Sequence, residues 1–425
     1  MVVTIVVLLI LAGVTISLLL DENGIIKKSK DARREYGTSK TNEQEQMDNA
    51  NDWIEEATAE PTPKVNVNTK AGENSTINGK KGNSNNPTIP AGYIPINTET
   101  SNWGNGKDAP SQDSVKHGLV IKDEKNNEWV WVPVPDVTVM CDTSNTTEYT
   151  LCGTTGDTAV TTNKYSKSGI ISGKTRITPG TTSDFREPDL VVGSGTEYDA
   201  SDTSSDTYYK TILGKTGTKE QLAQLFADEY KAMIESVSKY GGFYIGRYEL
   251  SGTVTEPTEK PGKTLTNTDW YNLYNACRSS KLQASDKVKT QMIWGCQWDV
   301  TMNWLISSGA KTSDEVNKDS STWGNYNNYT EGTAGYEKNA GLPQNTGSSE
   351  NWKANNIYDL AGNVWEWTQE ANGTSRRAGR GGCYNLHGSG FPASYRANNS
   401  PVRSDDENIR FSSHFNNKVI LDTRA

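Results

Sequence analysis

The side chains that most often carry catalysis are scarce in this chain of 425 residues. Its three histidines are His117, His387 and His414. They are too few and too scattered for a histidine-rich metal centre, and they argue against a conventional nucleophile triad. The sequence therefore points away from both of these classes of enzyme.

The five cysteines offer a second kind of chemistry. Cys141 with Cys152 would close a short hairpin, and Cys277 could meet Cys296 across a helix-rich segment, but spacing alone does not establish either disulfide. Cys383 is left without a partner. No charged residue near it in the sequence would clearly lower its pKa, so it is not an obvious nucleophile.

Oxygen ligands for a hard cation could come from Asn363 and Glu366. They lie in the run Gly362-Asn363-Val364-Trp365-Glu366-Trp367, where Gly-Asn favours a turn and the two tryptophans must bury large apolar areas. We expect a compact, loop-rich core here, with calcium as a candidate structural ion. The alternative is a capped turn with a solvated glutamate, and no other cofactor is required.

Helices that would position these residues follow from hydrophobic spacing. Apolar residues three and four apart predict amphipathic helices over residues 219–238 and 292–306. We expect both helices to pack on the core.

Composition restricts the function further. A net charge of −9 and a pI near 5.1 argue against a nucleic-acid partner, which needs a basic surface. The chain has 19 Tyr and 12 Trp but only 6 Phe, and Tyr and Trp suit recognition because they offer amphipathic contact area at small entropic cost. A mean hydropathy of −0.72 also predicts many loops and a wet, extracellular surface.

The N-terminal part predicts an anchor. Residues 2–20 are uncharged and overwhelmingly aliphatic, long enough to cross most of a bilayer. Residues 27–56 favour a helical stalk, and residues 61–95 are rich in Pro, Thr, Asn and Gly, which predicts a flexible linker. We therefore predict a transmembrane helix and stalk at 1–57, a linker at 58–105 and a folded domain at 106–425.

The anchor also resembles a known family. Residues 8–16, followed by Glu22-Asn-Gly-Ile-Ile-Lys-Lys28, are similar to the N-terminal helix of type IV pilin-like proteins of Gram-positive bacteria. The chain lacks that family's basic leader, glycine cleavage site and following glutamate. The resemblance implies export of the remaining chain, with other pilin subunits as partners and a structural minor pilin as one alternative function.

The folded domain resembles the formylglycine-generating enzyme (sulfatase-modifying factor) family. The resemblance rests on the run from Asn356 to Trp367, on Arg380-Gly-Gly382 and on Ala393-Ser-Tyr-Arg396. It implies an α+β, C-type-lectin-like fold, in which residues 118–121, 128–133 and 242–249 would be strands. Catalytic members bind copper with two cysteines placed soon after Arg-Gly-Gly, whereas Cys383 has no second thiol after it. We therefore expect no enzyme activity, with a copper-dependent oxidase as the alternative.

The composition of the last segment carries a genetic signature. Apart from Glu407, every residue type from Cys383 to Asn417 can be reached from an Asn codon by replacing adenines. The region 380–417 thereby resembles the variable region of diversity-generating retroelement targets, which display variable residues on C-type-lectin-like folds. The resemblance implies a surface-displayed protein that binds a protein or glycan ligand, with fixed Gly, Pro and Arg positions as scaffold. The predicted ligand-binding residues are Cys383, Tyr384, Asn385, His387, Phe391, Tyr395, Asn398, Arg403, Asp405 and Asp406.

Overall fold

The chain divides into two compact units, Met1–Pro61 and Thr62–Ala425. The computed structural model describes residues 61–104, 109–140, 148–150, 159–161, 185–186, 212–213, 219–327, 342–372, 376–399, 401, 415–416 and 419–423. Almost all of these belong to the second unit, which mixes helices with mostly antiparallel sheets. That mixture agrees with the predicted α+β class at this coarse level.

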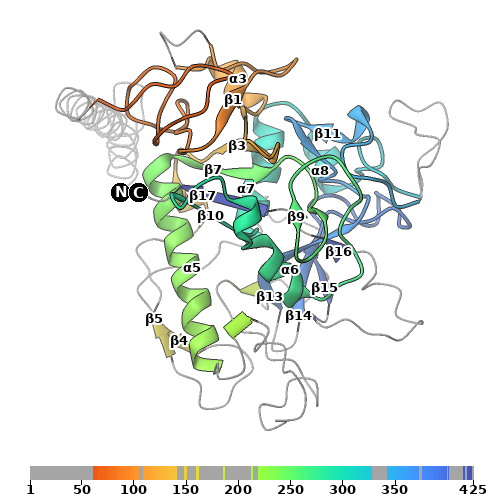
Figure 1. The fold of residues 1–425 in the computed structure, drawn as a ribbon. Coiled ribbons are helices and arrows are strands. Elements are labelled where there is room, and N and C mark those ends of the chain that lie inside the picture. Colours follow the sequence, from red (N-terminus) through yellow and green to blue (C-terminus); the bar gives the residue numbers. More distant parts are fainter. Residues whose placement is uncertain are drawn as a thin grey trace, which may run out of the picture. The chain divides into compact units, whose positions relative to one another are not determined.

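A six-stranded antiparallel sheet is the largest element among the described residues (Figure 1). Its strands lie in the order β1 (Ile94–Ile96), β2 (Val120–Lys122), β3 (Glu128–Pro133), β7 (Gly242–Gly246), β17 (Val419–Thr423) and β10 (Val288–Met292). The predicted strands at 118–121, 128–133 and 242–249 correspond to β2, β3 and β7. The structure thus confirms the three strands, with β7 ending earlier than predicted.

Strand β3 shows why this sheet is buried on both faces. Successive side chains of a strand point to opposite faces, and here Trp129 and Trp131 enter one hydrophobic cluster while Val130 and Val132 enter the other. A continuous apolar run such as Trp-Val-Trp-Val therefore suits a central strand between two packed layers.

Two long helices cover the sheet. Helix α5 (Lys219–Tyr240) includes the whole predicted span of residues 219–238, and it contributes Tyr230, Met233 and Val237 to the second cluster. Helix α7 (Gly295–Ser307) begins three residues after Met292, because Met292 ends strand β10. The prediction of a helix from 292 was therefore right for the helix and wrong for its start.

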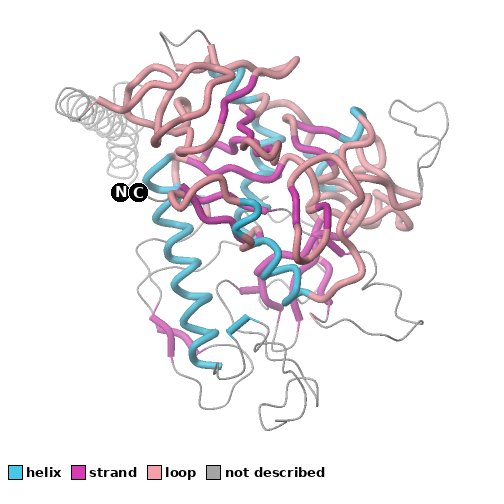
Figure 2. The backbone as a smooth tube through the Cα atoms, in the orientation of Figure 1, coloured by secondary structure: helices cyan, strands magenta, loops and turns pink. Residues whose placement is uncertain are grey.

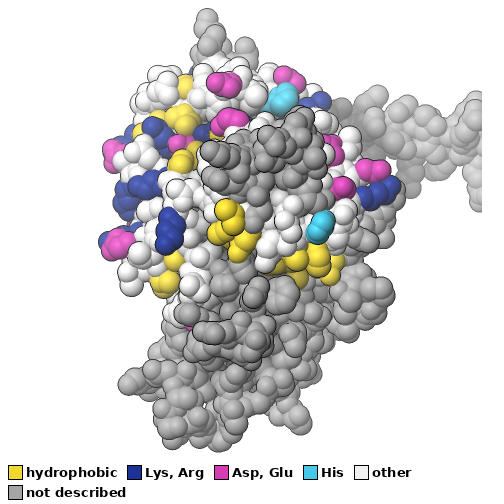
Figure 3. All heavy atoms as spheres, turned by 90° about the vertical axis from the view of Figure 1, so that its right-hand side faces the viewer, with side chains coloured by type: hydrophobic (Ala, Val, Ile, Leu, Met, Phe, Trp, Pro, Cys, Tyr) yellow, Lys and Arg dark blue, Asp and Glu magenta, His cyan; other side chains and the backbone are white. Residues whose placement is uncertain are grey.

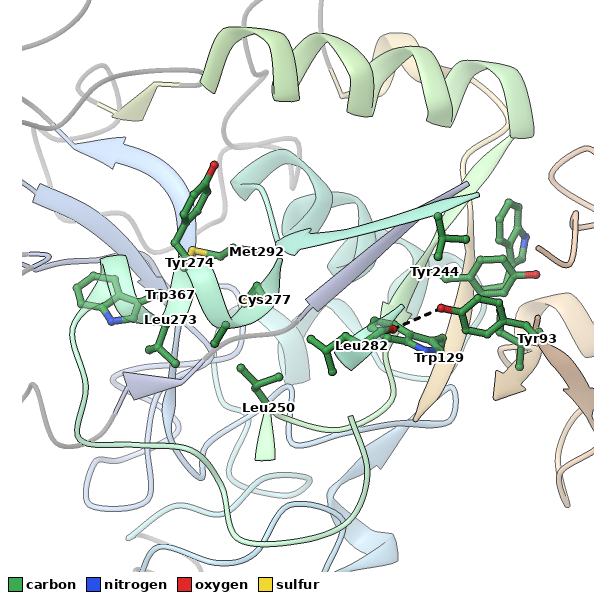
Figure 4. Close-up of a cluster of buried hydrophobic side chains, with 14 of the residues drawn as sticks. Tyr93, Trp129, Tyr244, Leu250, Leu273, Tyr274, Cys277, Leu282, Met292 and Trp367 are labelled. Atoms are coloured by element: carbon green, nitrogen blue, oxygen red, sulfur yellow. Dashed lines mark hydrogen bonds between the residues drawn. The ribbon is translucent and has the colours of Figure 1, made fainter. Parts of the chain in front are cut away.

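The first hydrophobic cluster joins helix α6 (Trp270–Cys277) to the sheet (Figure 4). Figure 4 shows Leu273, Tyr274 and Cys277 on this helix near Met292 of β10. Cys296, at the start of α7, lies instead in the second cluster. Cys277 and Cys296 do not form the expected disulfide, because each is buried in a different hydrophobic cluster.

Residues 61–104 are folded, so the predicted linker over 58–105 is corrected. Ile77, Ile89, Tyr93 and Trp103 are all buried in the first cluster, and the Tyr93 hydroxyl donates to the Leu282 carbonyl oxygen at 3.4 Å (Figure 4). The composition is poor in apolar residues, but these few are placed so that each reaches the core. The prediction of a linker from composition was therefore wrong for this segment.

The second sheet contains the C-terminal motif. Its strands are β15 (Ala397–Asn399), β14 (Arg376–Arg380), β13 (Trp365–Asn372) and β16 (Phe415–Asn416), with β6 (Phe185–Arg186) paired to one end of β13. Only the pairing of β13 with β16 is parallel. Figure 2 shows that loops predominate around this sheet, as the sequence predicts for the surroundings of Trp365.

Shorter elements complete the described part. The helices are α3 (Gln112–Lys116) and α8 (Ser313–Asn317), with 3-10 turns η1 (Val137–Val139), η3 (Ser280–Leu282) and η4 (Glu350–Trp352). Three small hairpins pair β4 (Glu148–Thr150) with β5 (Ala159–Thr161), β8 (Ser251–Gly252) with β9 (Pro257–Thr258), and β11 (Lys353–Ala354) with β12 (Ile357–Tyr358).

Several expectations fall outside the described residues. Among the residues that are described, no helix combines the length and apolar character needed to cross a membrane. The predicted membrane segment at 2–20 and the stalk at 27–56 lie outside this part. So do Cys141 and Cys152, and their predicted disulfide stays a prediction.

Candidate functional site

The loop of residues 381–396, which connects β14 to β15, is the centre of the candidate site. An arginine lies at each end of it, Arg380 on β14 and Arg396 just before β15. Both arginines reach inward to two carboxylates, Asp299 of α7 and Glu370 of β13. The four side chains, which we call the charge cluster, have no exposed surface.

Ion pairs connect each arginine of the charge cluster to both carboxylates. Arg380 Nη2 lies 2.6 Å from Asp299 Oδ1, and Arg380 Nη1 lies 3.4 Å from Glu370 Oε2. Arg396 Nε lies 3.1 Å from Glu370 Oε2, and the Arg396 guanidinium also pairs with Asp299. Two positive and two negative groups compensate each other, which a buried charge requires.

The electrostatics of the cluster depend on this pairing. Burial alone would lower the pKa of Arg396, but Asp299 and Glu370 outweigh it and hold that pKa above its ordinary value. Burial and the repulsion from Arg396 lower the pKa of Arg380. Each arginine therefore needs both carboxylates, and both ends of the loop are fixed to α7 and β13.

Hydrogen bonds hold the loop backbone between its two ends. The Tyr326 hydroxyl donates to the carbonyl oxygens of Gly381 at 2.7 Å and Phe391 at 3.0 Å. The Trp298 indole N–H donates to the Ala393 carbonyl oxygen at 3.1 Å. The Tyr384 N–H donates to the Asn363 carbonyl oxygen at 2.9 Å. Tyr326, Trp298 and Asn363, which we call the framework, thus bind the main chain of the loop. These contacts do not depend on which side chains the loop carries.

Gly382 explains how the loop can pass so close to the framework. Its φ is +80°, a backbone conformation that residues other than glycine rarely adopt. A Cβ atom here would lie 2.4 Å from the Phe391 carbonyl oxygen and 2.8 Å from the Tyr326 ring. The second glycine of Arg380-Gly-Gly382 is therefore a packing requirement, as its place in the motif suggested.

Side chains on the other side of the loop form an outward surface. Phe391 and Tyr395 are half-buried and lie in contact with each other, with ring centroids 5.0 Å apart. Both pack on the buried Trp365, at 5.9 and 6.0 Å. Because Trp365 supports them from beneath, these two rings have defined positions and remain partly accessible.

Polar side chains flank these rings. Asn385 and His387 are exposed, and Tyr384 is half-buried. Figure 3 shows one face of the molecule on which small hydrophobic patches lie among uncharged polar atoms, with a histidine beside one patch. Five predicted binding residues, Tyr384, Asn385, His387, Phe391 and Tyr395, are therefore brought together with some accessible surface.

Cys383 differs from the prediction. It was expected among the exposed binding residues, but its side chain is 1% exposed and packs in the first hydrophobic cluster. Its thiol donates to the Asn385 side-chain oxygen at 2.8 Å. Burial raises the pKa of this thiol to about 12. Cys383 therefore supports the loop from below and does not contact a ligand at the surface.

Asn363 also has a different role from the expected one. Its side-chain oxygen accepts from the Asn325 amide at 3.2 Å and from the Gln344 N–H at 3.0 Å, while its amide donates to Glu249 at 2.6 Å. These bonds occupy the oxygen that was expected to bind calcium. The geometry gives Asn363 a structural role in the turn before β13.

Glu366 lies in the core, and its assignment as a calcium ligand stays a prediction. It is fully buried, and one of its oxygens lies 3.1 Å from where a Cβ atom of Gly381 would be. Among the described residues, no group of three or more His, Cys, Asp or Glu side chains could hold a metal ion. The alternative of a solvated glutamate is wrong, because the Glu366 side chain is fully buried.

Other predicted binding residues are not placed as side chains. Asn398 lies on β15, where its backbone pairs with Ala378, but its side chain is not described. Arg403, Asp405 and Asp406 lie outside the described residues. Their assignment to the binding surface stays a prediction.

The acidic partners Asp299 and Glu370 were missed by sequence reasoning. The two arginines were expected as scaffold, and the structure bears this out through the charge cluster. A weak signal was available: Asp299 is the single charged residue of the largely apolar helix Gly295–Ser307, and Glu366 and Glu370 are the charged residues of the strand Trp365–Asn372. A charge in such a place usually has a buried partner.

Comparisons with known proteins give little further information. No family model matches the chain, and no curated protein matches it. One matching solved structure is Treponema denticola variable protein 1, with 16% identity over 44% of this chain and 85% of that chain, at a TM-score of 0.27. The likeness is too distant to carry an argument about this chain's fold or function.

Proposed function

We propose that the 381–396 loop is a ligand-binding surface whose outward side chains can vary while its backbone stays fixed. The observation that carries this proposal is the separation of roles within the loop. Main-chain atoms of Gly381, Phe391 and Ala393 bind the framework, whereas Asn385 and His387 project outward. Such an arrangement lets side-chain identity change without loss of the loop's conformation.

The accessible chemistry suits recognition of another molecule. Half-buried rings at Phe391 and Tyr395 offer contact area at low entropic cost, and exposed Asn385 and His387 offer hydrogen bonds. We propose a protein or glycan ligand, in keeping with this mixture. On this account the C-type-lectin-like fold of the formylglycine-generating enzyme type supplies the framework, with Arg380 and Arg396 as scaffold.

An oxidase function is less consistent with the site. The thiolate is the reactive form of cysteine and the form that binds copper. The thiol of Cys383 is buried, with a pKa raised to about 12, so it stays protonated at neutral pH. We therefore propose that this chain is not an enzyme, and supplying copper with a cysteine-containing peptide should yield no oxidised product.

Diversification of the loop is part of the proposal. The outward residues Tyr384, Asn385, His387 and Phe391 are all types reachable from Asn codons by changes at adenine. A nearby near-copy of codons 380–417, differing only at adenines and accompanied by a reverse transcriptase gene, would support it. A gene neighbourhood that holds neither would count against diversification and leave the binding surface as a fixed one.

Anchorage at the cell surface is proposed from the sequence alone. Residues 2–20 would insert in the membrane and carry the folded unit outside, with pilin subunits as candidate partners. Fractionation of cells that produce the full chain, followed by protease treatment of intact cells, tests this. The folded unit should be membrane-associated and cleaved from outside; protection of the unit in intact cells would contradict the orientation.

A substitution scan of residues 381–396 tests the proposed separation of roles. Every single substitution is displayed and scored for resistance to protease, which reports folding. We expect tolerance at exposed Asn385, His387 and Ser389, and loss of folding at Gly382 and Arg396. Equal intolerance along the whole loop would indicate a purely structural segment and would contradict the proposal.

A further inference from the structure

A pocket of about 650 Å³ lies apart from the 381–396 loop. Four segments line it: the turn at residues 84–85, helix α3, the chain from Pro133 to Val139 after β3, and the second half of α7. Its volume lies within the range of roughly 300–1,000 Å³ that is typical of small-molecule sites. None of the residues assigned to the loop surface takes part in it.

The wall of the pocket is mainly aliphatic. It is lined by Val115, Val134, Val139, Val300 and Ile306, together with Trp304. Pro133 and Pro135 add apolar surface and have no N–H to donate. Because Trp304 is only 6% exposed, it offers little ring face for stacking a sugar. This lining fits a flexible hydrocarbon chain.

Val139 marks the opening of this apolar wall. Its side chain is 39% exposed, and with Leu342 it makes up the exposed large hydrophobic residues in the part of the chain that is described. Exposed apolar surface beside a pocket is typical of ligand sites. A ligand that covers Val139 would remove this surface from water.

The rim of the pocket carries an available positive charge. Lys116, the last residue of α3, is exposed and lines the pocket. Within the described part of the chain, no ion-pair partner of Lys116 is found. The acidic rim residue Asp136, by contrast, already has an interaction within the chain. The polar end of a ligand should therefore be anionic. The amides of Gln112 and Asn85 also line the pocket and add hydrogen-bond donors to it.

We propose that this pocket binds an alkyl carboxylate, that is, a medium-chain fatty acid. The hydrocarbon chain would lie among Pro135, Val139 and Ile306, and the carboxylate would face Lys116. The proposal concerns a second site, and it stands or falls independently of the loop surface.

Binding of decanoate to the full chain tests the proposal. Each methylene buried adds a constant increment to affinity, so decanoate should bind about tenfold tighter than octanoate. Lys116→Gln should weaken decanoate binding about threefold or more and leave binding of the neutral decanol unchanged. Val139→Asp should weaken both ligands. Lys287→Gln removes an equally exposed lysine outside the pocket and should change neither.

Photocrosslinking separates the pocket from the apolar N-terminal segment. A diazirine analogue of decanoate is added to the full chain, and mass spectrometry identifies the labelled peptides. Label within residues 133–139 or 300–308, reduced in Val139→Asp, supports the proposal. Label confined to other peptides, or equal decanoate affinity in the parent and Lys116→Gln proteins, would overturn it. Unchanged thermal unfolding of both variants ensures that a loss of binding is not a loss of folding.

Discussion

Arg380 Nη2 lies 2.6 Å from Asp299 Oδ1, and neither side chain has any exposed surface. The contact joins the end of β14 to helix α7 at the residue where the 381–396 loop begins. Together with Arg396 and Glu370 it fixes both ends of the loop to elements of the hydrophobic core. The proposed binding surface therefore depends on buried charges that no ligand touches.

Removing one arginine from the charge cluster should strongly destabilise the fold. Arg380→Met retains most of the side-chain volume but leaves two buried carboxylates with a single arginine. We expect the free energy of unfolding to fall by about 3–5 kcal/mol, measured by urea denaturation. The control is Lys287→Met at an exposed position, which should leave stability unchanged. A similar small effect for both variants would show that the cluster is not needed.

Gly382→Ala should destabilise the fold more than the same substitution at Gly309, a glycine with the same φ. Gly382 and Gly309 both have φ of +80°, but only Gly382 has atoms within 4 Å of an added Cβ. We expect Gly309→Ala to cost about 1 kcal/mol from backbone strain, and Gly382→Ala to cost several times as much. Thermal unfolding of the two variants measures the difference. Equal losses would mean that the loop can move away from Phe391.

Cys383 should make stability fall at alkaline pH. Its thiol has a pKa of about 12 in the folded chain and an ordinary value near 9 when unfolded. Between these two pH values the thiol loses its proton in the unfolded chain but keeps it in the folded chain. The contribution of the buried thiol to stability is therefore complete below pH 9 and is lost as the pH rises toward 12.

The measurement compares the parent with Cys383→Ala, because the comparison cancels titration of the tyrosines. From pH 9 upward the parent should lose about 1.4 kcal/mol per pH unit more than the variant. Parallel stability curves would indicate that the thiol titrates normally and is exposed, as the sequence alone had suggested.

Asn363→Asp should destabilise the turn before β13. The Asn363 amide donates to Glu249 at 2.6 Å, and aspartate would place a second carboxylate there. We expect a loss of at least about 3 kcal/mol at neutral pH, which becomes smaller as acid protonates the pair. Asn126→Asp is a suitable control, since Asn126 is exposed and also has positive φ, +63° against +55°. Chemical denaturation at two pH values distinguishes the variants, and an undisturbed Asn363→Asp protein would refute the assigned contact.

Local patterns predicted much of the fold. The family resemblance predicted the strand at 128–133, which is β3, and apolar spacings of three and four predicted helix α5. The sequence did not predict that residues 61–104 fold, because their few apolar side chains, such as Ile77 and Trp103, show no periodicity. These side chains are buried because they pack against the other residues of the first hydrophobic cluster. Average composition is a poor guide where a segment adds a few anchors to an existing core.

The candidate site was predicted less completely. The resemblance to a variable region predicted Asn385, His387, Phe391 and Tyr395 as a surface group; in the structure Asn385 and His387 are exposed, whereas Phe391 and Tyr395 are half-buried. The burial of Cys383 could not be read from sequence, since neither of its neighbours in the chain determines which side of the loop it faces. The charge cluster joins residues as far apart as Asp299 and Arg396. A charge in an apolar segment indicates a buried partner, but a single sequence does not identify which residue that partner is.

Selection of binders from two libraries tests the central claim most directly. One library randomises Asn385, His387, Ser389, Phe391 and Tyr395. The other randomises five exposed or half-exposed positions, namely Lys122, Glu124, Lys125 and Asn126 in the β2–β3 turn and the neighbouring Lys281. Both are displayed on the full chain and selected against the same unrelated proteins. We predict specific binders from the loop library alone, with the charge cluster residues unchanged. Binders at equal frequency from both libraries, or none from the loop library despite folded variants, would contradict the account.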